Sequence, residues 1–105
     1  MDVSDNIQFR IKEKSFIARL AAYKLKASSV AIVIGNTIHL HNCSKQHFLT
    51  NERWVKHELC HIKQFREHGF IPFIFKYIVE SIRKGYYMNK YEVEARAAES
   101  GVVQV

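Results

Sequence analysis

Residues 57–61 read His-Glu-Leu-Cys-His, and this H-E-x-x-H spacing constrains the fold more than any other feature of the chain. The motif lies inside an amphipathic segment, 51–69, that is expected to be helical. Residues four apart on a helix share one face about 6 Å apart, so the imidazoles of His57 and His61 can converge on one metal ion. Glu58 is rotated by about 100° from His57 and about 60° from His61. It can therefore flank the ion without binding it and accept a proton from water there.

The two histidines are expected at the border between the core and solvent. On a helical wheel, an apolar arc lies to one side of them, made of Trp54, Val55, Leu59, Ile62 and Phe65. Charged residues form the opposite face, namely Arg53, Lys56, Lys63 and Glu67. A metal held at this border is attached to the core and reachable from solvent, which favours a functional site over a chance pair of surface histidines.

The remaining sequence predicts a small α+β domain that spans residues 1–105. Alternating apolar residues predict a short strand over 7–11, and helical spacing predicts a helix over 14–26. A β-branched run, a Gly-Asn turn and an alternating segment predict a β-hairpin over 30–41. The elements expected after it are a loop over 42–46, the motif helix from Thr50 or Asn51 to Gly69, a helix from Pro72 to Lys84 that ends at Gly85, a connection over 86–89 and a last helix over 91–100.

Length, charge and cysteine content narrow the class of protein. A chain of 105 residues is expected to form one domain, since smaller pieces could not bury a core. Its 16 Lys and Arg against 10 Asp and Glu give a net charge of +6, which suits anionic partners and ordinary cytosolic proteins alike. Two cysteines are too few for a disulfide framework, the polar and acidic N-terminus is unlike a signal peptide, and the apolar run over 70–79 is too short for a transmembrane segment. We expect a cytoplasmic protein.

A site with two histidines needs a third protein ligand. His68 lies about 16 Å along the helix from His57 and cannot reach the same ion. The metzincin pattern H-E-x-x-H-x-x-G-x-x-H fails, because Gln64 and Glu67 stand at its glycine and third histidine. Cys60 points toward the wet side of the helix, which favours a packing role. An acidic residue from another helix is therefore expected.

The last predicted helix offers two such residues, Glu92 and Glu94. Here the chain resembles the gluzincins, zinc peptidases with H-E-x-x-H on one helix and a glutamate ligand on a later one. Several members write the second motif as E-x-x-A-D or E-x-x-S-D with the first Glu on zinc, and residues 92–95, Glu-Val-Glu-Ala, fit it. The resemblance implies Glu92 as the third ligand, with Glu94 as the alternative. Arg96 replaces the final Asp, which helps to orient a zinc histidine in the family, and leaves that role to Glu99 or a backbone carbonyl.

The order of elements is also similar to that of small single-domain gluzincins, so the resemblance implies a zincin-like metallopeptidase domain. It implies Zn²⁺ held by His57, His61 and Glu92, with Glu58 as the general base in the hydrolysis of peptide bonds. Candidate donors to the oxyanion are Tyr86, Tyr87, Tyr91 and His39. In zincins of this plan an edge strand beside the motif helix binds an extended substrate, and we expect Thr37–His41 to be that strand for a peptide or protein partner.

Other interpretations stay open from the sequence. The chain could be a non-catalytic module whose basic surface contacts a protein or nucleic acid, but aromatic and basic residues do not interleave, so no specific nucleic-acid partner is expected. The apolar run over 70–79 could touch a membrane, yet its helical period favours burial in the core. Two histidines and a carboxylate also suit Fe(II). The β-prone tail over 102–105 would make an enzyme latent if it lay in the cleft. The oligomeric state is not predicted.

Overall fold

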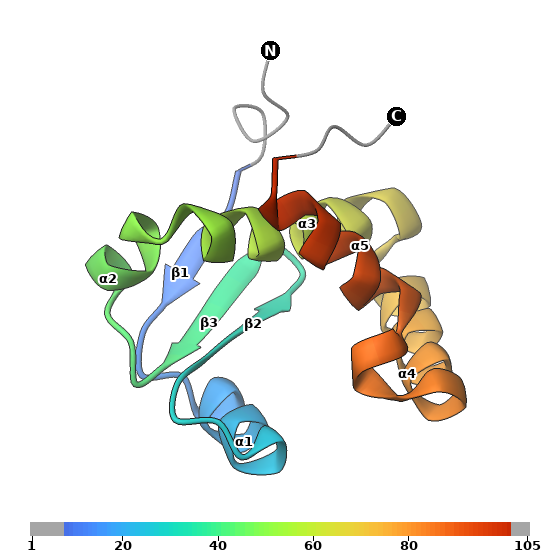
Figure 1. Ribbon diagram of the computed structural model, residues 1–105, viewed down its shortest axis with the longest axis horizontal. Helices are drawn as coiled ribbons and strands as arrows, with labels where there is room; N and C mark the ends of the chain where they lie inside the picture. Colours follow the sequence, from blue (N-terminus) through green and yellow to red (C-terminus); the bar gives the residue numbers. More distant parts are fainter. Residues whose placement is uncertain (1–7, 102–105) are drawn as a thin grey trace.

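A computed structural model describes residues 8–101 of the chain. Within this range it contains five helices and a three-stranded sheet, so the predicted α+β class is confirmed. In chain order the elements are β1 (Arg10–Lys12), α1 (Phe16–Leu25), β2 (Val30–Ile34), β3 (Thr37–His41), α2 (Lys45–Thr50), α3 (Glu52–His68), α4 (Phe70–Met88) and α5 (Lys90–Glu99). Helix α1 lies on one side of the sheet, and α3 crosses the other side with α5 next to it (Figure 1).

The sheet has the strand order β1-β3-β2, so β3 lies in the middle. The predicted hairpin is confirmed, since β2 and β3 pair antiparallel with Val33 opposite Ile38. Its turn contains Gly35 with a left-handed φ of 66°, which favours glycine. Strand β1 pairs in parallel with the other side of β3. The expectation that Thr37–His41 is an edge strand is therefore wrong, and β2 is the edge strand beside it among the described residues.

Local signals explain most of the helix boundaries. Asn51 caps α3, as predicted, by accepting a hydrogen bond from the backbone amide of Trp54 at 3.1 Å. Helix α4 begins at Phe70, two residues before the expected start at Pro72. Gly85 interrupts α4 with a non-helical φ of 81°, so the predicted end at this glycine corresponds to a break in the helix.

Two predicted segments differ from the structure. The loop expected over 42–46 is shorter, because Ser44 caps the additional helix α2 by accepting from the His47 amide at 3.1 Å. The strand expected over 7–11 is Arg10–Lys12, with residue 7 outside the described range. The tail over 102–105, with its latency hypothesis, also lies outside the described residues.

Two apolar clusters hold the sheet between its helices. The larger lies between the sheet and α3, and its buried members include Ile38, Leu40, Phe48, Ile62 and Phe65. The smaller cluster joins α1 to the opposite face through two small residues, Ala18 and Ala22. Helix α3 is therefore anchored along its apolar stripe, which fixes the direction in which the motif side chains point.

Helix α4 differs from its expected role as a buried core helix. Phe73 is buried at 2% exposure, whereas on the opposite face Ile71, Phe75 and Ile82 are 68%, 70% and 79% exposed. One side of the helix packs on the core, and an apolar side faces solvent. None of the helices within residues 8–101 is long and apolar enough to cross a membrane.

Candidate metal centre

Helices α3 and α5 bring the predicted ligands together. His57 and His61 project from α3 one turn apart, and Glu92 lies in the first turn of α5. One ligand atom from each of the three residues lies within 4.8 Å of the others. Within residues 8–101, no other set of histidine, cysteine or acidic side chains meets in this way.

The Glu92 carboxylate lies between the two imidazole rings. Its Oε1 is 3.1 Å from Nε2 of His57, and its Oε2 is 3.2 Å from Nε2 of His61. The rings meet edge to face, with centroids 5.0 Å apart. The two Nε2 atoms and the carboxylate therefore face a common space, as the ligands of one ion must.

Glu99 holds the ring of His57 from its other side. Nδ1 of His57 is 2.6 Å from Oε2 of Glu99, and because a carboxylate accepts, Nδ1 donates. Nε2, which faces Glu92, is then the nitrogen that would bind a metal after losing its proton. Arg53 lies 3.5 Å from the other oxygen of Glu99. Arg96 donates to the Tyr87 carbonyl at 2.5 Å, and its guanidinium lies over the Tyr87 ring. Arg96 therefore takes no part in orienting His57.

Gln64 holds the ring of His61 in the same sense. Its amide nitrogen donates to the Tyr91 carbonyl at 3.1 Å and to the Glu94 carboxylate at 2.5 Å, groups that only accept. Its amide oxygen therefore faces Nδ1 of His61, at 2.9 Å, and Nε2 is again the nitrogen that would bind a metal after losing its proton. His57, His61 and Glu92 are called the triad below. The alternative ligand Glu94 is exposed and contacts Gln64, so the structure does not bring it into the triad.

The charges of the triad suit a cation. Burial alone would raise the pKa of Glu92, but hydrogen bonds with His57 and His61 outweigh it and hold that pKa well below its usual range. Burial would lower the pKa of the two histidines, and their hydrogen bonds with Glu92 outweigh it and raise both. The site therefore offers one ionised carboxylate and two imidazoles that release protons when a metal binds.

Glu58 lies beside the triad without joining it. It is buried at 4% exposure and lines the same cleft as His57, His61 and Glu92. Burial raises the pKa of Glu58 to about 8, an effect that His61 partly offsets and Glu92 reinforces. A pKa of about 8 keeps most of Glu58 protonated at pH 7, and a cation bound at the neighbouring ligands would lower that pKa and favour the carboxylate form that accepts a proton.

Of the four candidate oxyanion donors, Tyr86 lines this cleft. Burial and the charge of Glu92 raise the pKa of Tyr86, which keeps its hydroxyl protonated and able to donate. Tyr87 is 67% exposed, Tyr91 packs in the core, and His39 hydrogen-bonds at the start of α1. The structure therefore leaves Tyr86 as the one candidate of the four that faces the triad.

Tyr77 is a residue of the site that the sequence did not reveal. Its hydroxyl donates to Oε2 of Glu92, and burial beside that charge raises its pKa, so it remains a donor. Tyr77 thereby fixes the carboxylate oxygen that faces His61. It lies within the apolar run of α4 at the spacing of a core residue, so no local signal distinguishes it.

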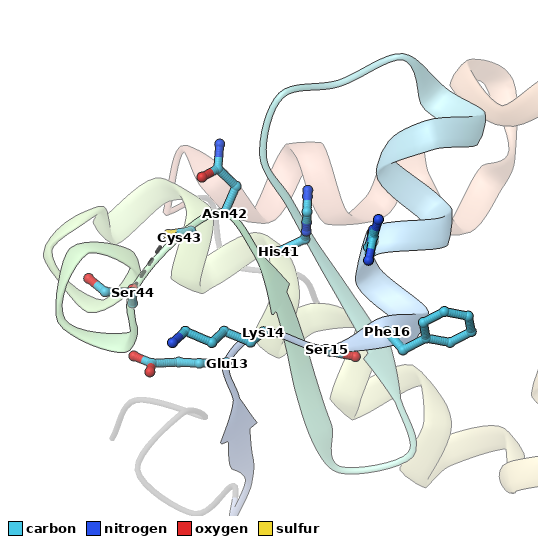
Figure 2. Close-up of a pocket in the computed structure, with 9 residues that line it drawn as sticks. Glu13, Lys14, Ser15, Phe16, His41, Asn42, Cys43 and Ser44 are labelled. Carbon is cyan, nitrogen blue, oxygen red and sulfur yellow. Dashed lines mark hydrogen bonds between the residues drawn. The ribbon is translucent and has the colours of Figure 1, made fainter.

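The triad and Glu58 line a cleft of about 220 Å³ between β2 and α4. A wider hollow of about 670 Å³ lies where α1 begins and β3 ends, and Figure 2 shows Glu13 and Lys14 extending to one side of it, away from His41. The larger hollow is therefore not the one that contains the candidate metal ligands. Among the described residues, the side chains that could hold a metal line the smaller cleft.

The donor set fits zinc. Two imidazole nitrogens and a carboxylate oxygen, with the fourth position left for water, are a ligand set of catalytic zinc sites. Fe(II) takes the same donors when they occupy one face of an octahedron. Cys60 is not among the side chains that meet at this site, and burial raises the pKa of its thiol to about 12.

The first prediction concerns the third ligand. Replacing Glu92 with Gln removes the anionic oxygen between the rings, and we expect it to weaken zinc binding by more than the roughly 10–100-fold loss that follows removal of an outer partner. Glu94→Gln keeps an oxygen that can accept from Gln64, so its affinity should stay close to that of the wild type. Competition with a chromophoric chelator measures both, and a greater loss in Glu94→Gln would contradict the assignment.

A second prediction concerns the support of His57. Glu99→Ala removes the acceptor at Nδ1 and should lower zinc affinity about 10–100-fold, whereas Glu99→Gln keeps an acceptor oxygen and should lose less. Arg53→Ala removes the neighbouring cation but leaves the acceptor, so it serves as the control. Equal zinc affinity in Glu99→Ala and the wild type would show that Glu99 does not position the ring.

No protein-family model, curated protein or solved structure matches this chain.

Proposed function

We propose that this protein is a zinc-dependent metallopeptidase built on a zincin-like domain. The observation that carries the proposal is the meeting of His57, His61 and Glu92 around a common space, with Glu58 beside them on the wall of a cleft. Zinc ligands and a separate carboxylate are the two requirements for hydrolysis by a metal-activated water.

The free-energy cost of burying these ionisable side chains also supports a functional role. Glu58, His61 and Glu92 are all buried, and ionisable groups lose hydration when they leave water. An apolar cluster at the same place would avoid this penalty. Perturbed ionisable groups gathered in a cleft are typical of sites selected for chemistry rather than for stability.

The side chains divide the work of peptide hydrolysis between them. When bound, zinc supplies a Lewis acid and lowers the pKa of water from about 15.7 to about 7. Glu58 accepts the proton that the water releases as it attacks the peptide carbonyl, and donates it to the leaving amine. Tyr86 donates a hydrogen bond to the oxygen of the attacked carbonyl. His57 and His61 keep their orientation because Glu99 and Gln64 hold their Nδ1 atoms.

The substrate backbone is assigned to β2 rather than to β3. Strand β3 is paired on both sides, whereas β2 pairs with β3 alone among the described residues. All of Val30–Ile34 lines the cleft that contains the triad. An extended peptide or protein segment that pairs with this edge would present its backbone next to Glu58.

The alternative, a non-catalytic module with a basic surface, receives no comparable support. Two basic residues of the predicted wet face of α3 have acidic neighbours: Arg53 lies 3.5 Å from Glu99, and Lys63 lies 3.9 Å from Glu67. Such pairs reduce the positive potential that would attract a polyanion.

The test of the proposal is Glu58→Gln. This variant should bind zinc as the wild type does, because Glu58 is not a ligand, and should cleave an unfolded protein about 10²–10⁴-fold more slowly, because it cannot accept the proton. Cleavage of casein is followed by mass spectrometry on zinc-loaded protein, with Glu94→Gln as the matched control. No cleavage by the zinc-loaded wild type, or equal rates in the variant, would contradict the proposal.

A further inference from the structure

We infer that the cleft takes an extended peptide segment with a bulky apolar side chain beside the metal centre. This inference rests on the proposed function and names its substrate class. It follows from three features of the described residues: the unpaired edge of β2, the apolar walls of the cleft, and its limited volume.

The cleft follows the edge of a strand rather than one face of the sheet. Alternate side chains of β2 point to opposite faces, so that Val33 packs in the cluster under α3 and Ile32 packs with α1. Nevertheless, every residue of Val30–Ile34 lines the cleft. A cavity lined by both sets of side chains must run along the outer edge of the strand. Within residues 8–101 no strand pairs there, and backbone donors and acceptors on a free edge suit an extended peptide.

The residues that line the cleft favour an apolar substrate side chain over a charged one. Apart from the side chains of the metal centre and the two tyrosines near it, every residue that lines the cleft is apolar. Helix α1 contributes Ala21 and Leu25, and α4 contributes Ile74 and Ile78. A charged side chain placed between these walls would lose its hydration without a partner, whereas an apolar one would gain from burial.

The size of the cleft limits what it can hold. Its volume of about 220 Å³ is below the roughly 300–1,000 Å³ of pockets that enclose a whole drug-sized ligand. It suits one large side chain and the adjoining backbone. Leu25 and Ile78, at 45% and 51% exposure, stand on opposite walls with apolar surface that such a side chain would cover.

The direct test uses three N-acetyl amino-acid hydroxamates that differ in the side chain alone: glycine, aspartate and leucine. Each carries the same zinc-binding group, so differences in affinity report on the walls. For the zinc-loaded wild type, we expect the leucine compound to bind about tenfold or more tightly than the glycine compound, in line with the discrimination that apolar pockets reach. The aspartate compound should bind no better than the glycine compound. Isothermal titration measures all three.

Substitutions in the cleft lining test whether the preference for the leucine compound arises there. Ile78→Ser and Leu25→Ser should reduce the preference for leucine, while their zinc content and melting temperature stay unchanged because both residues are half-exposed. The matched controls are Ile71→Ser and Leu20→Ser, on the same helices but outside the cleft lining, and they should keep the full preference.

Two results would overturn the inference: equal affinities for the three hydroxamates, or a preference that survives in Ile78→Ser and Leu25→Ser together. Both leave the proposed peptidase intact, since zinc would still be bound. Failure of the wild type to take up zinc is a different outcome, because it would contradict the proposed function itself.

Discussion

The contact between α3 and α5 is the constraint on which the site depends. Glu92 reaches from α5 to both histidines of α3, and Glu99, from the other end of α5, reaches His57. In return Gln64 of α3 donates to the backbone carbonyl of Tyr91. The polar residues that join these helices are thus the same residues that form and support the candidate metal ligands. A change in the crossing of the two helices would separate the donor atoms, so the fold and the site are specified together.

The rest of the fold places α3 and α5 beside the outer edge of β2, where an extended peptide could pair. The sheet packs against α3 on one side and α1 on the other (Figure 1), and within residues 8–101 the outer side of β2 is unpaired. Apolar side chains of α1 and α4 line the two sides of the cleft. The described residues form the cleft by combining an unpaired strand edge with two helices that expose apolar side chains. Ile74 and Ile78 of α4 line this cleft, whereas the exposed residues Ile71, Phe75 and Ile82 lie outside its lining.

The part of the site that follows the helical period could be predicted from the sequence. The spacing of His57 and His61 brings two imidazoles onto one face of any helix, and the second motif singles out Glu92 over Glu94. The residues that hold the ligands in place could not be predicted in this way. Gln64 contacts His61 and Tyr77 contacts Glu92 because of the way in which three helices cross. Neither belongs to a pattern, and Tyr77 has the spacing of a core residue.

The sequence-based predictions that are wrong concern contacts between segments far apart in the chain. The parallel pairing of β1 with β3 joins segments distant in sequence, and it turns the expected edge strand Thr37–His41 into the central one. Likewise, the apolar period of α4 shows that one face is apolar but not that this face is covered.

The proposed peptidase requires that one ion bind between the Nε2 atoms of His57 and His61 and the carboxylate of Glu92. Anomalous diffraction at the zinc absorption edge from crystals of the zinc-loaded protein tests this directly. We expect a peak about 2.0–2.2 Å from both Nε2 atoms and from a Glu92 oxygen, with Glu99 and Gln64 still hydrogen-bonded to the Nδ1 atoms. A zinc peak elsewhere with none at the triad, or coordination through Nδ1, would contradict it.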